Sequence, residues 1–224
     1  DKAGNSNEAS TTGTTSTVTS GTVSGAITFT SPTWSNGTAS IKVSTNTSYQ
    51  IEYQKNSTTG TWTKIASGGT ISGLSHNNTV YARLTDGVNS GEYASTSIKD
   101  TIAPTVSIST SGLTYNSVKL TVTAVDNQSG LADSGRYTYY LNSVQKASNN
   151  TNYYDFTGLT ANTSYTLKVV VKDKAGLTTT KEVAITTAEL PGDNANTVAS
   201  NPSTYYGAEV TGYTCTNSAA VSKW

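Results

Sequence analysis

The sequence predicts an all-β fold built from two tandem β-sandwiches, with a partial segment at each end. Three observations lead to this prediction. Apolar and polar residues alternate with a period of two in many short runs, separated by Gly, Asn and Ser turns, as in half-buried antiparallel strands. No window has a convincing helical period. The same plan of strands and turns occurs twice along the chain, which indicates a diverged tandem repeat.

The first predicted sandwich covers residues 24–103. Pro104 marks its boundary, because proline fixes its own backbone φ and lacks an N–H donor. The last strand of this unit is expected in "GEYASTSIKD". The alternating runs place one set of apolar side chains on a common inner face: Ile27 and Phe29; Ala39, Ile41 and Val43; Tyr49, Ile51 and Tyr53; Val80, Ala82 and Leu84.

The second predicted sandwich covers residues 104–188. Seven short runs of strand character fall within it, which is the number of strands in a small sandwich domain. Its last strand is expected in "TKEVAITT". The inner face is predicted from four of the runs: Val118, Leu120, Val122 and Ala124; Tyr137, Tyr139 and Leu141; Tyr165, Leu167, Val169 and Val171; Val183 and Ile185.

The two ends of the chain are interpreted as pieces of further domains. The opening "DKAGN" repeats the "DKAG" of residues 173–176, which precedes the last strand of the second unit. Residues 1–23 are therefore expected to be the remnant last strand of an upstream domain followed by a Ser/Thr-rich linker. The Thr/Ser/Gly-rich run of residues 5–23 has two interpretations, a linker or a weak edge strand. Residues 189–203 are predicted to be a linker, and residues 204–224 to begin a further, truncated domain.

The stretch "GLTANTSYTLKVVVKDKAG" (residues 158–176) resembles the fibronectin type III family. The spacing of Leu159 and Tyr165 is similar to that family's tyrosine corner, in which the ring hydroxyl ties a strand to the preceding turn. The family's usual Trp is missing from "KLTVTAV", so the resemblance implies that Tyr137 or Phe156 fills its space. It also implies a module of a longer array, with no catalytic residues and no cofactor.

Residues 24–103 resemble a shorter relative, an immunoglobulin-like repeat of bacterial surface proteins. The turn before its long strand is one residue longer than in the second unit. Either Val80 or Tyr81 therefore faces inward. The segment from residue 204 onward resembles a domain entry in modular surface proteins of gut Clostridia-like bacteria.

The composition excludes several classes of partner. Charged residues make up 12% of the chain, with 14 basic and 14 acidic residues, whereas nucleic-acid binding needs clustered positive charge. No apolar stretch approaches 20 residues, so no insertion into a membrane is expected in this segment. Cys215 is the single cysteine and cannot form an internal disulfide. Together with the Ser/Thr-rich surface, these features predict a bacterial secreted or cell-surface protein.

Two kinds of binding site are weighed. Asp126, Asp133 and Asp173 are expected at one pole of the second sandwich, where carboxylates and carbonyls could hold calcium. The competing interpretation is that aspartates in such turns accept backbone hydrogen bonds. Outward aromatic rings could bind a glycan or a host protein, or could only cover the sheets and pair across strands; the candidates are Trp34, Trp62, Tyr140 and Tyr153.

The leading functional hypothesis is a non-catalytic spacer or stalk segment of a bacterial secreted or surface protein such as an adhesin, whose partners are the neighbouring domains of a longer chain. One alternative is an adhesin module that binds a host glycan or protein. Another is a strand-donating subunit of an extracellular filament. No enzyme is expected, because no acid–base or nucleophile constellation occurs and the only histidine, His76, lies in a predicted turn.

Overall fold

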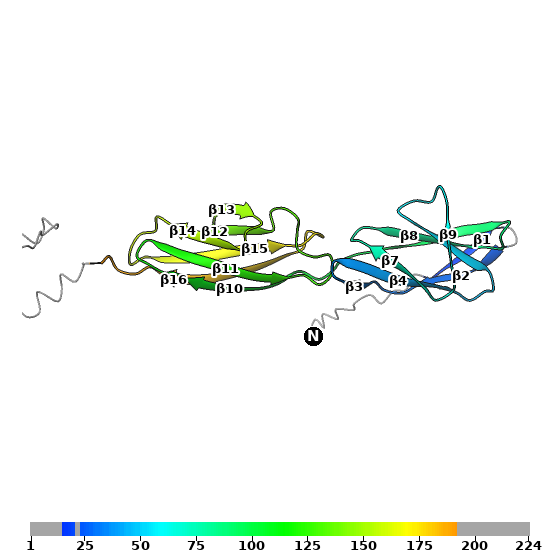
Figure 1. Cartoon of the computed structure of the whole chain (residues 1–224), viewed down its shortest axis with the longest axis horizontal. Coiled ribbons are helices and arrows are strands. Elements are labelled where there is room, and N and C mark those ends of the chain that lie inside the picture. The colour runs from blue at the N-terminus through cyan, green and yellow to red at the C-terminus, as the bar shows by residue number, and fades with distance from the viewer. Residues whose placement is uncertain (1–14, 21–22, 192–224) are drawn as a thin grey trace, which may run out of the picture.

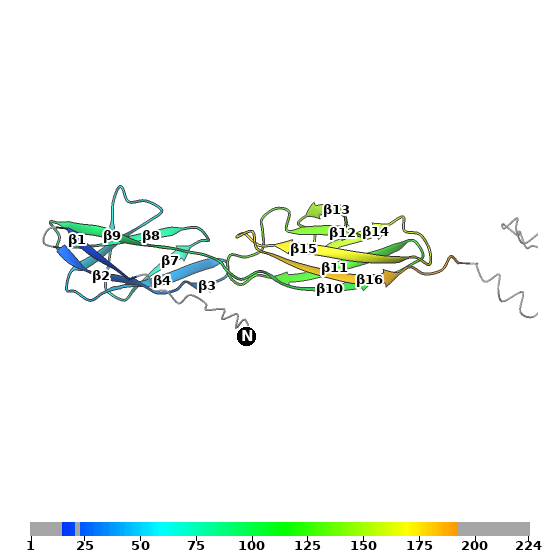
Figure 2. The ribbon, with the colours of Figure 1, turned by 180° about the vertical axis from the view of Figure 1, so that it is seen from behind.

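The computed structural model describes residues 15–20 and 23–191, with side chains described from residue 23. The described chain contains strands and turns but no helix, so the predicted all-β fold class is confirmed. Two β-sandwiches lie end to end along the long axis of the molecule (Figure 1), and the view from behind shows the same arrangement (Figure 2). Each sandwich has a hydrophobic core of its own.

The first sandwich packs a five-stranded sheet against a four-stranded sheet. The larger sheet has the order β1-β2-β4-β3, and β7 also pairs with β4; its strands are β1 (Thr15–Ser20), β2 (Val23–Phe29), β3 (Thr33–Ser35), β4 (Thr38–Thr45) and β7 (Gly69–Leu74). The smaller sheet has the order β6-β5-β8-β9, with β5 (Gln50–Lys55), β6 (Thr63–Ile65), β8 (Thr79–Thr85) and β9 (Ser90–Ser97). All pairs are antiparallel.

The second sandwich repeats this plan with fewer strands. A three-stranded sheet has the order β10-β11-β14, formed by β10 (Thr105–Ser111), β11 (Ser117–Val125) and β14 (Tyr153–Thr157). A four-stranded sheet has the order β13-β12-β15-β16, formed by β12 (Tyr137–Leu141), β13 (Val144–Asn149), β15 (Ser164–Lys172) and β16 (Thr178–Thr186). Both predicted last strands are therefore present, as β9 and β16.

The core of the first sandwich decides which residue of the long strand β8 faces inward. Val80 is completely buried, together with Ala82 and Leu84 on the same face. Tyr81 lies on the opposite face, where its ring meets Tyr93 edge-on with centroids 5.3 Å apart. Of the two alternatives, Val80 therefore faces inward, although the turn before β8 is one residue longer than the corresponding turn of the second unit.

The core of the second sandwich is built around aromatic rings. Tyr137 and Phe156, the two candidates for the missing Trp space, are both buried. Tyr139 is buried completely; it stacks on Tyr137 and on Tyr154, the latter at a centroid distance of 5.4 Å. Tyr154 in turn meets Phe156 edge-on, so a row of four rings packs in this core.

The corner before β15 has the geometry that the family resemblance implies. The backbone N–H of Thr160 donates a hydrogen bond to the hydroxyl oxygen of Tyr165 at 2.9 Å. Leu159 is buried at the same turn and packs in the core. The strand is therefore tied back to the turn that leads into it.

Residues 15–20 fall in the run for which the sequence left two interpretations open, a linker or a weak edge strand, and the structure shows the strand. They form β1, which pairs along its whole length with β2 in the register Thr15↔Thr28 to Ser20↔Val23. Thr and Val favour strands. The edge of β2 supplies pairing partners for the backbone N–H and C=O groups of residues 15–20. Residues 1–14 and 192–224 lie outside the described residues, so the remnant strand and the truncated last domain stay predictions.

Candidate metal centre at the junction of the two sandwiches

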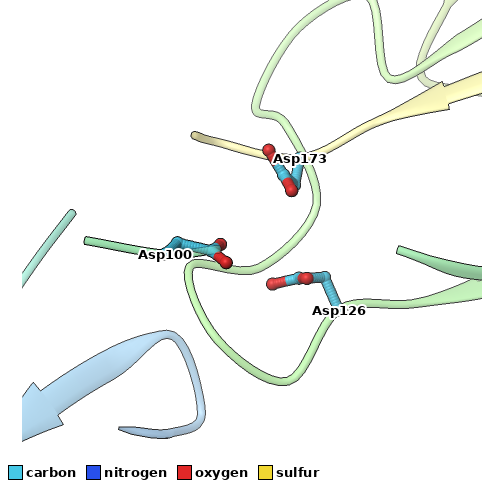
Figure 3. Close-up of side chains that lie close together, drawn as sticks. All are labelled: Asp100, Asp126 and Asp173. Carbon is cyan, nitrogen blue, oxygen red and sulfur yellow. The ribbon is translucent and has the colours of Figure 1, made fainter. Parts of the chain in front are cut away.

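Three aspartates from three separate segments meet where the two sandwiches join. Asp100 lies in the connection between β9 and β10, Asp126 directly follows β11, and Asp173 directly follows β15. Each offers a carboxylate oxygen, and these oxygens all lie within 4.8 Å of one another. Figure 3 shows the three side chains converging on a common space. We refer to Asp100, Asp126 and Asp173 as the acid cluster.

Short turns of the second sandwich hold two members of the cluster in place. Asp126 Oδ1 accepts the backbone N–H groups of Gln128 at 3.1 Å and of Gly130 at 2.6 Å. Gly130 has a φ of 84°, a left-handed conformation that glycine adopts without steric cost. Asp173 Oδ1 accepts the N–H of Leu177 at 2.8 Å. As weighed from the sequence, these aspartates do accept backbone hydrogen bonds, but each uses only one of its two oxygens for them.

Asp100 connects the two sandwiches. Its backbone N–H donates to Nδ1 of His76, in the turn between β7 and β8 of the first sandwich, at 2.9 Å. Its Oδ2 accepts the N–H of Ser129, in the second sandwich, at 2.9 Å, while its Oδ1 accepts the N–H of Ile102 at 3.0 Å. The connection is thus fixed by hydrogen bonds on both sides.

The surroundings of the cluster are largely closed to solvent. Asp173 is 1% exposed and Asp100 is 4% exposed, while Asp126 is half-buried. Among residues 23–191, no ion pair involves any of the three carboxylates. Burial raises the pKa of Asp173, and the nearby charges of Asp100 and Asp126 raise it further, against the opposing effect of the Leu177 N–H.

The sequence-based metal candidates coincide with this cluster only in part. Asp126 and Asp173 belong to it, but the side chain of Asp133 is 81% exposed and lies 3.2 Å from Nζ of Lys174. Asp100 was missed because the search for ligands was confined to one sandwich. The signal was present as an acidic residue in "KDTIAP", immediately before the boundary proline.

The candidate ligand-facing aromatic rings do not form one surface. Trp34 belongs to β3 and packs against the first core. The other three rings each lie under a cation: Arg83 is 4.2 Å from the Trp62 centroid, Lys168 is 4.5 Å from Tyr140, and Lys119 is 4.2 Å from Tyr153. Trp62 precedes β6, Tyr140 lies in β12 and Tyr153 in β14, so the four rings are distributed over four different sheets.

The order of the strands characterises both sandwiches. If β1 is set aside and β2 and β3 are counted as one interrupted strand, each unit packs its first, second and fifth strands as one sheet. Its fourth, third, sixth and seventh strands form the other sheet, in that order. Both units thus have an immunoglobulin-like, fibronectin type III-like β-sandwich fold. The first unit differs from the second by the added strand β1.

Comparison with known proteins gives structural likeness only. No protein-family model matches the sequence, and no curated protein matches it. The fold is similar to a segment of two fibronectin type III domains from chicken tenascin, with 15% identity, coverage of 77% of this chain and all of that one, and a TM-score of 0.47. It is also similar to fibronectin(III)-like modules of Clostridium thermocellum CbhA, with 17% identity, coverage of 73% of this chain and 94% of that one, and a TM-score of 0.33.

Proposed function

We propose that this chain is a non-catalytic spacer segment of a longer bacterial secreted or cell-surface protein. The observation that carries the proposal is the end-to-end arrangement of two sandwiches, each with a separate core (Figure 1). Such an arrangement adds length rather than a binding cleft. A spacer of this kind projects a neighbouring domain of the same chain away from its attachment point.

The short connection between the sandwiches supports this role. Only residues 98–104 separate β9 from β10. Besides the contacts of Asp100, the N–H of Thr101 donates to Oε1 of Gln128 at 3.0 Å. The β3–β4 turn of the first sandwich also approaches the second closely, because a Cβ placed on Gly37 would lie 3.5 Å from the carbonyl oxygen of Ser129. A connection held in this way resists bending more than a free linker does.

The absence of catalysis is part of the proposal. Within residues 23–191, Nδ1 of the only histidine is engaged by the Asp100 N–H, so this nitrogen is not available as a general base. The described residues also include no helix with the length and apolar character that crossing a lipid bilayer requires. The extracellular location is part of the proposal and rests on the composition of the sequence.

Neither alternative gains comparable support. A glycan platform requires several rings on one face, whereas the four candidate rings lie on four sheets. Strand donation would add a strand to an open sheet edge of another copy, whereas both units already have last strands of their own, β9 and β16. The proposed donor strand, within residues 1–12, lies outside the described residues.

Light scattering combined with small-angle X-ray scattering on the 224-residue chain tests the spacer role. We expect a monomer whose scattering profile gives a length close to that of two sandwiches end to end. A compact particle would contradict the proposal. Multimers that disappear when residues 1–20 are deleted would favour the filament alternative, and specific binding on a glycan array would favour the adhesin alternative.

A further inference from the structure

The acid cluster contains two buried oxygen atoms that nothing in the described chain satisfies. Oδ2 of Asp173 and Oδ2 of Asp126 are both inaccessible to solvent and have no hydrogen-bond partner. The hydroxyl of Ser129, in the turn that follows Asp126, is likewise buried and unpartnered. Buried polar atoms without partners are rare because leaving them unsatisfied is costly. Three of them around one junction point to a ligand there.

The charge of the cluster determines the sign of that ligand. Three carboxylates with oxygens within 4.8 Å of one another repel when they are ionised. Neither Asp100 nor Asp126 nor Asp173 forms an ion pair with a described Lys or Arg. A cation between them satisfies the free oxygens and removes the repulsion at the same time.

The donor atoms determine the class of cation. All are oxygens, whereas zinc and other transition metals favour sites that include imidazole or thiolate groups. Calcium accepts six to eight oxygen ligands in variable geometry, while magnesium requires a near-ideal octahedron and retains its water. The three aspartates come from separate turns, each fixed by its own backbone hydrogen bonds, an arrangement that suits the more tolerant ion. We propose that Asp100, Asp126 and Asp173 form a calcium site at the junction of the two sandwiches.

The proposed calcium site lies between the two sandwiches and has ligands attached to both. Asp100 is anchored to the first sandwich through His76, whereas Asp126 and Asp173 belong to the second. A bound calcium ion therefore ties the first unit to the second and stiffens the junction. The inference stands independently of the spacer role, because it depends only on the geometry of the cluster.

Isothermal titration calorimetry of the 224-residue chain, stripped of metal with EDTA and dialysed, tests the site with calcium chloride. We expect one strong site with a Kd of roughly 10⁻⁴ M or tighter, in the range of calcium-binding extracellular modules and sensors, and weaker binding of magnesium. Asp173→Asn and Asp100→Asn should each weaken calcium binding by at least about tenfold, because affinity depends on the number of charged ligands. Asp133→Asn is the matched control and should bind calcium as the unmodified chain does.

Each outcome decides the proposal. Absence of calcium binding by the unmodified chain overturns it. Equal loss of affinity in Asp133→Asn places the ion elsewhere and also overturns it. Retention of full affinity in Asp100→Asn confines the site to the second sandwich and overturns the bridging role. If a variant fails to fold by circular dichroism, the amide resonances of Ser129 and Gly130 in the unmodified chain give the answer, since they must shift on calcium addition. None of these outcomes alters the scattering test of the spacer.

Discussion

Tyr139 is the largest side chain that is fully buried in the described chain. A buried phenol needs a hydrogen-bond partner, and its hydroxyl donates to the carbonyl oxygen of Thr151 at 2.7 Å. Burial raises the pKa of this hydroxyl, because the ionised form would lose its water. The period-two pattern placed Tyr139 on the inner face, but it could not show that this ring, rather than Tyr137 or Phe156, would be the most deeply buried.

Replacement of Tyr139 by Phe should therefore destabilise the second sandwich. The change keeps the ring but removes the hydrogen bond, for an expected cost of about 1 kcal/mol in the free energy of unfolding. Chemical denaturation followed by circular dichroism measures it. Tyr140→Phe is the control. The ring of Tyr140 contacts Lys168 on the surface, so loss of its hydroxyl should leave the free energy of unfolding nearly unchanged. Equal effects of the two substitutions would contradict this account of the core.

Asp86 holds the turn between β8 and β9. Its Oδ1 accepts the N–H groups of Asn89 at 2.7 Å and Val88 at 2.8 Å. These bonds, that of Asn89 first, lower the pKa of Asp86 below its ordinary value of 3.8. Since the pKa is lower in the folded than in the unfolded chain, ionised Asp86 adds stability above the unfolded-state pKa, and this stability is lost as the pH falls through the folded-state pKa.

Asp86→Ala should consequently lower the thermal midpoint at neutral pH and lower it less in acid. The difference in thermal midpoint between the two chains should shrink as the pH falls below 3.8. The Asp86 carboxyl of the unmodified chain then becomes protonated and its hydrogen bonds to the turn weaken. Thermal melts of both chains at several pH values measure this difference. A difference that does not change with pH would show that packing, rather than charge, stabilises the turn.

At the scale of strands, most of the architecture follows from the sequence. Alternation predicted the inner faces of β4, β8, β11 and β15 because one side of each strand lies on a core and the other meets solvent. Strand β5 departs from that rule. Glu52 and Gln54 are buried although they alternate with the inward residue Ile51. Arg83 pairs with Glu52 at 2.7 Å and lies over Trp62. These contacts between distant segments cover the outer face of β5, and a local sequence pattern cannot predict them.

Strand β1 and the acid cluster were harder to predict for the same physical reason. The polar run of residues 15–20 pairs with the edge of β2, a contact that the local pattern of the run does not show. Asp126 and Asp173 could be placed at one pole because both follow predicted strands. Asp100 joins them only because the two sandwiches meet end to end (Figure 3). The spacing of residues within one unit contains no information about that meeting.

Deletion of residues 1–20 should weaken the first sandwich selectively. The edge of β2 would lose its backbone partners, and the buried residues Val23 and Ile27 would lose the strand beside them. Trp34 and Trp62 both lie in the first sandwich, whereas residues 104–188 contain no Trp. The thermal transition followed by tryptophan fluorescence should therefore move to lower temperature. The thermal transition of the second sandwich should change little. An unchanged fluorescence transition would show that β1 contributes nothing to stability.

At the scale of the whole molecule, the two cores should behave as separate folding units that share a junction. Leu84 is completely buried in the first core and Leu120 in the second. Replacing either by Ala should cost about 2–5 kcal/mol in the sandwich that contains it. Denaturation followed by tryptophan fluorescence should detect Leu84→Ala strongly and Leu120→Ala weakly. Equal shifts for the two variants would show that the junction couples both sandwiches into a single cooperative unit.

The pairing of β1 with β2 also has a mechanical consequence. β2 leads from the far end of the first sandwich toward the junction, and antiparallel β1 runs back toward that far end (Figure 1). Tension applied ahead of Thr15, directed away from the second sandwich, therefore peels β1 from β2 one pair at a time, beginning at Thr15↔Thr28. Peeling releases up to roughly 3.4 Å of chain per residue before the strands of the two cores begin to separate, so the hairpin is the extensible element in series with two stiffer bodies.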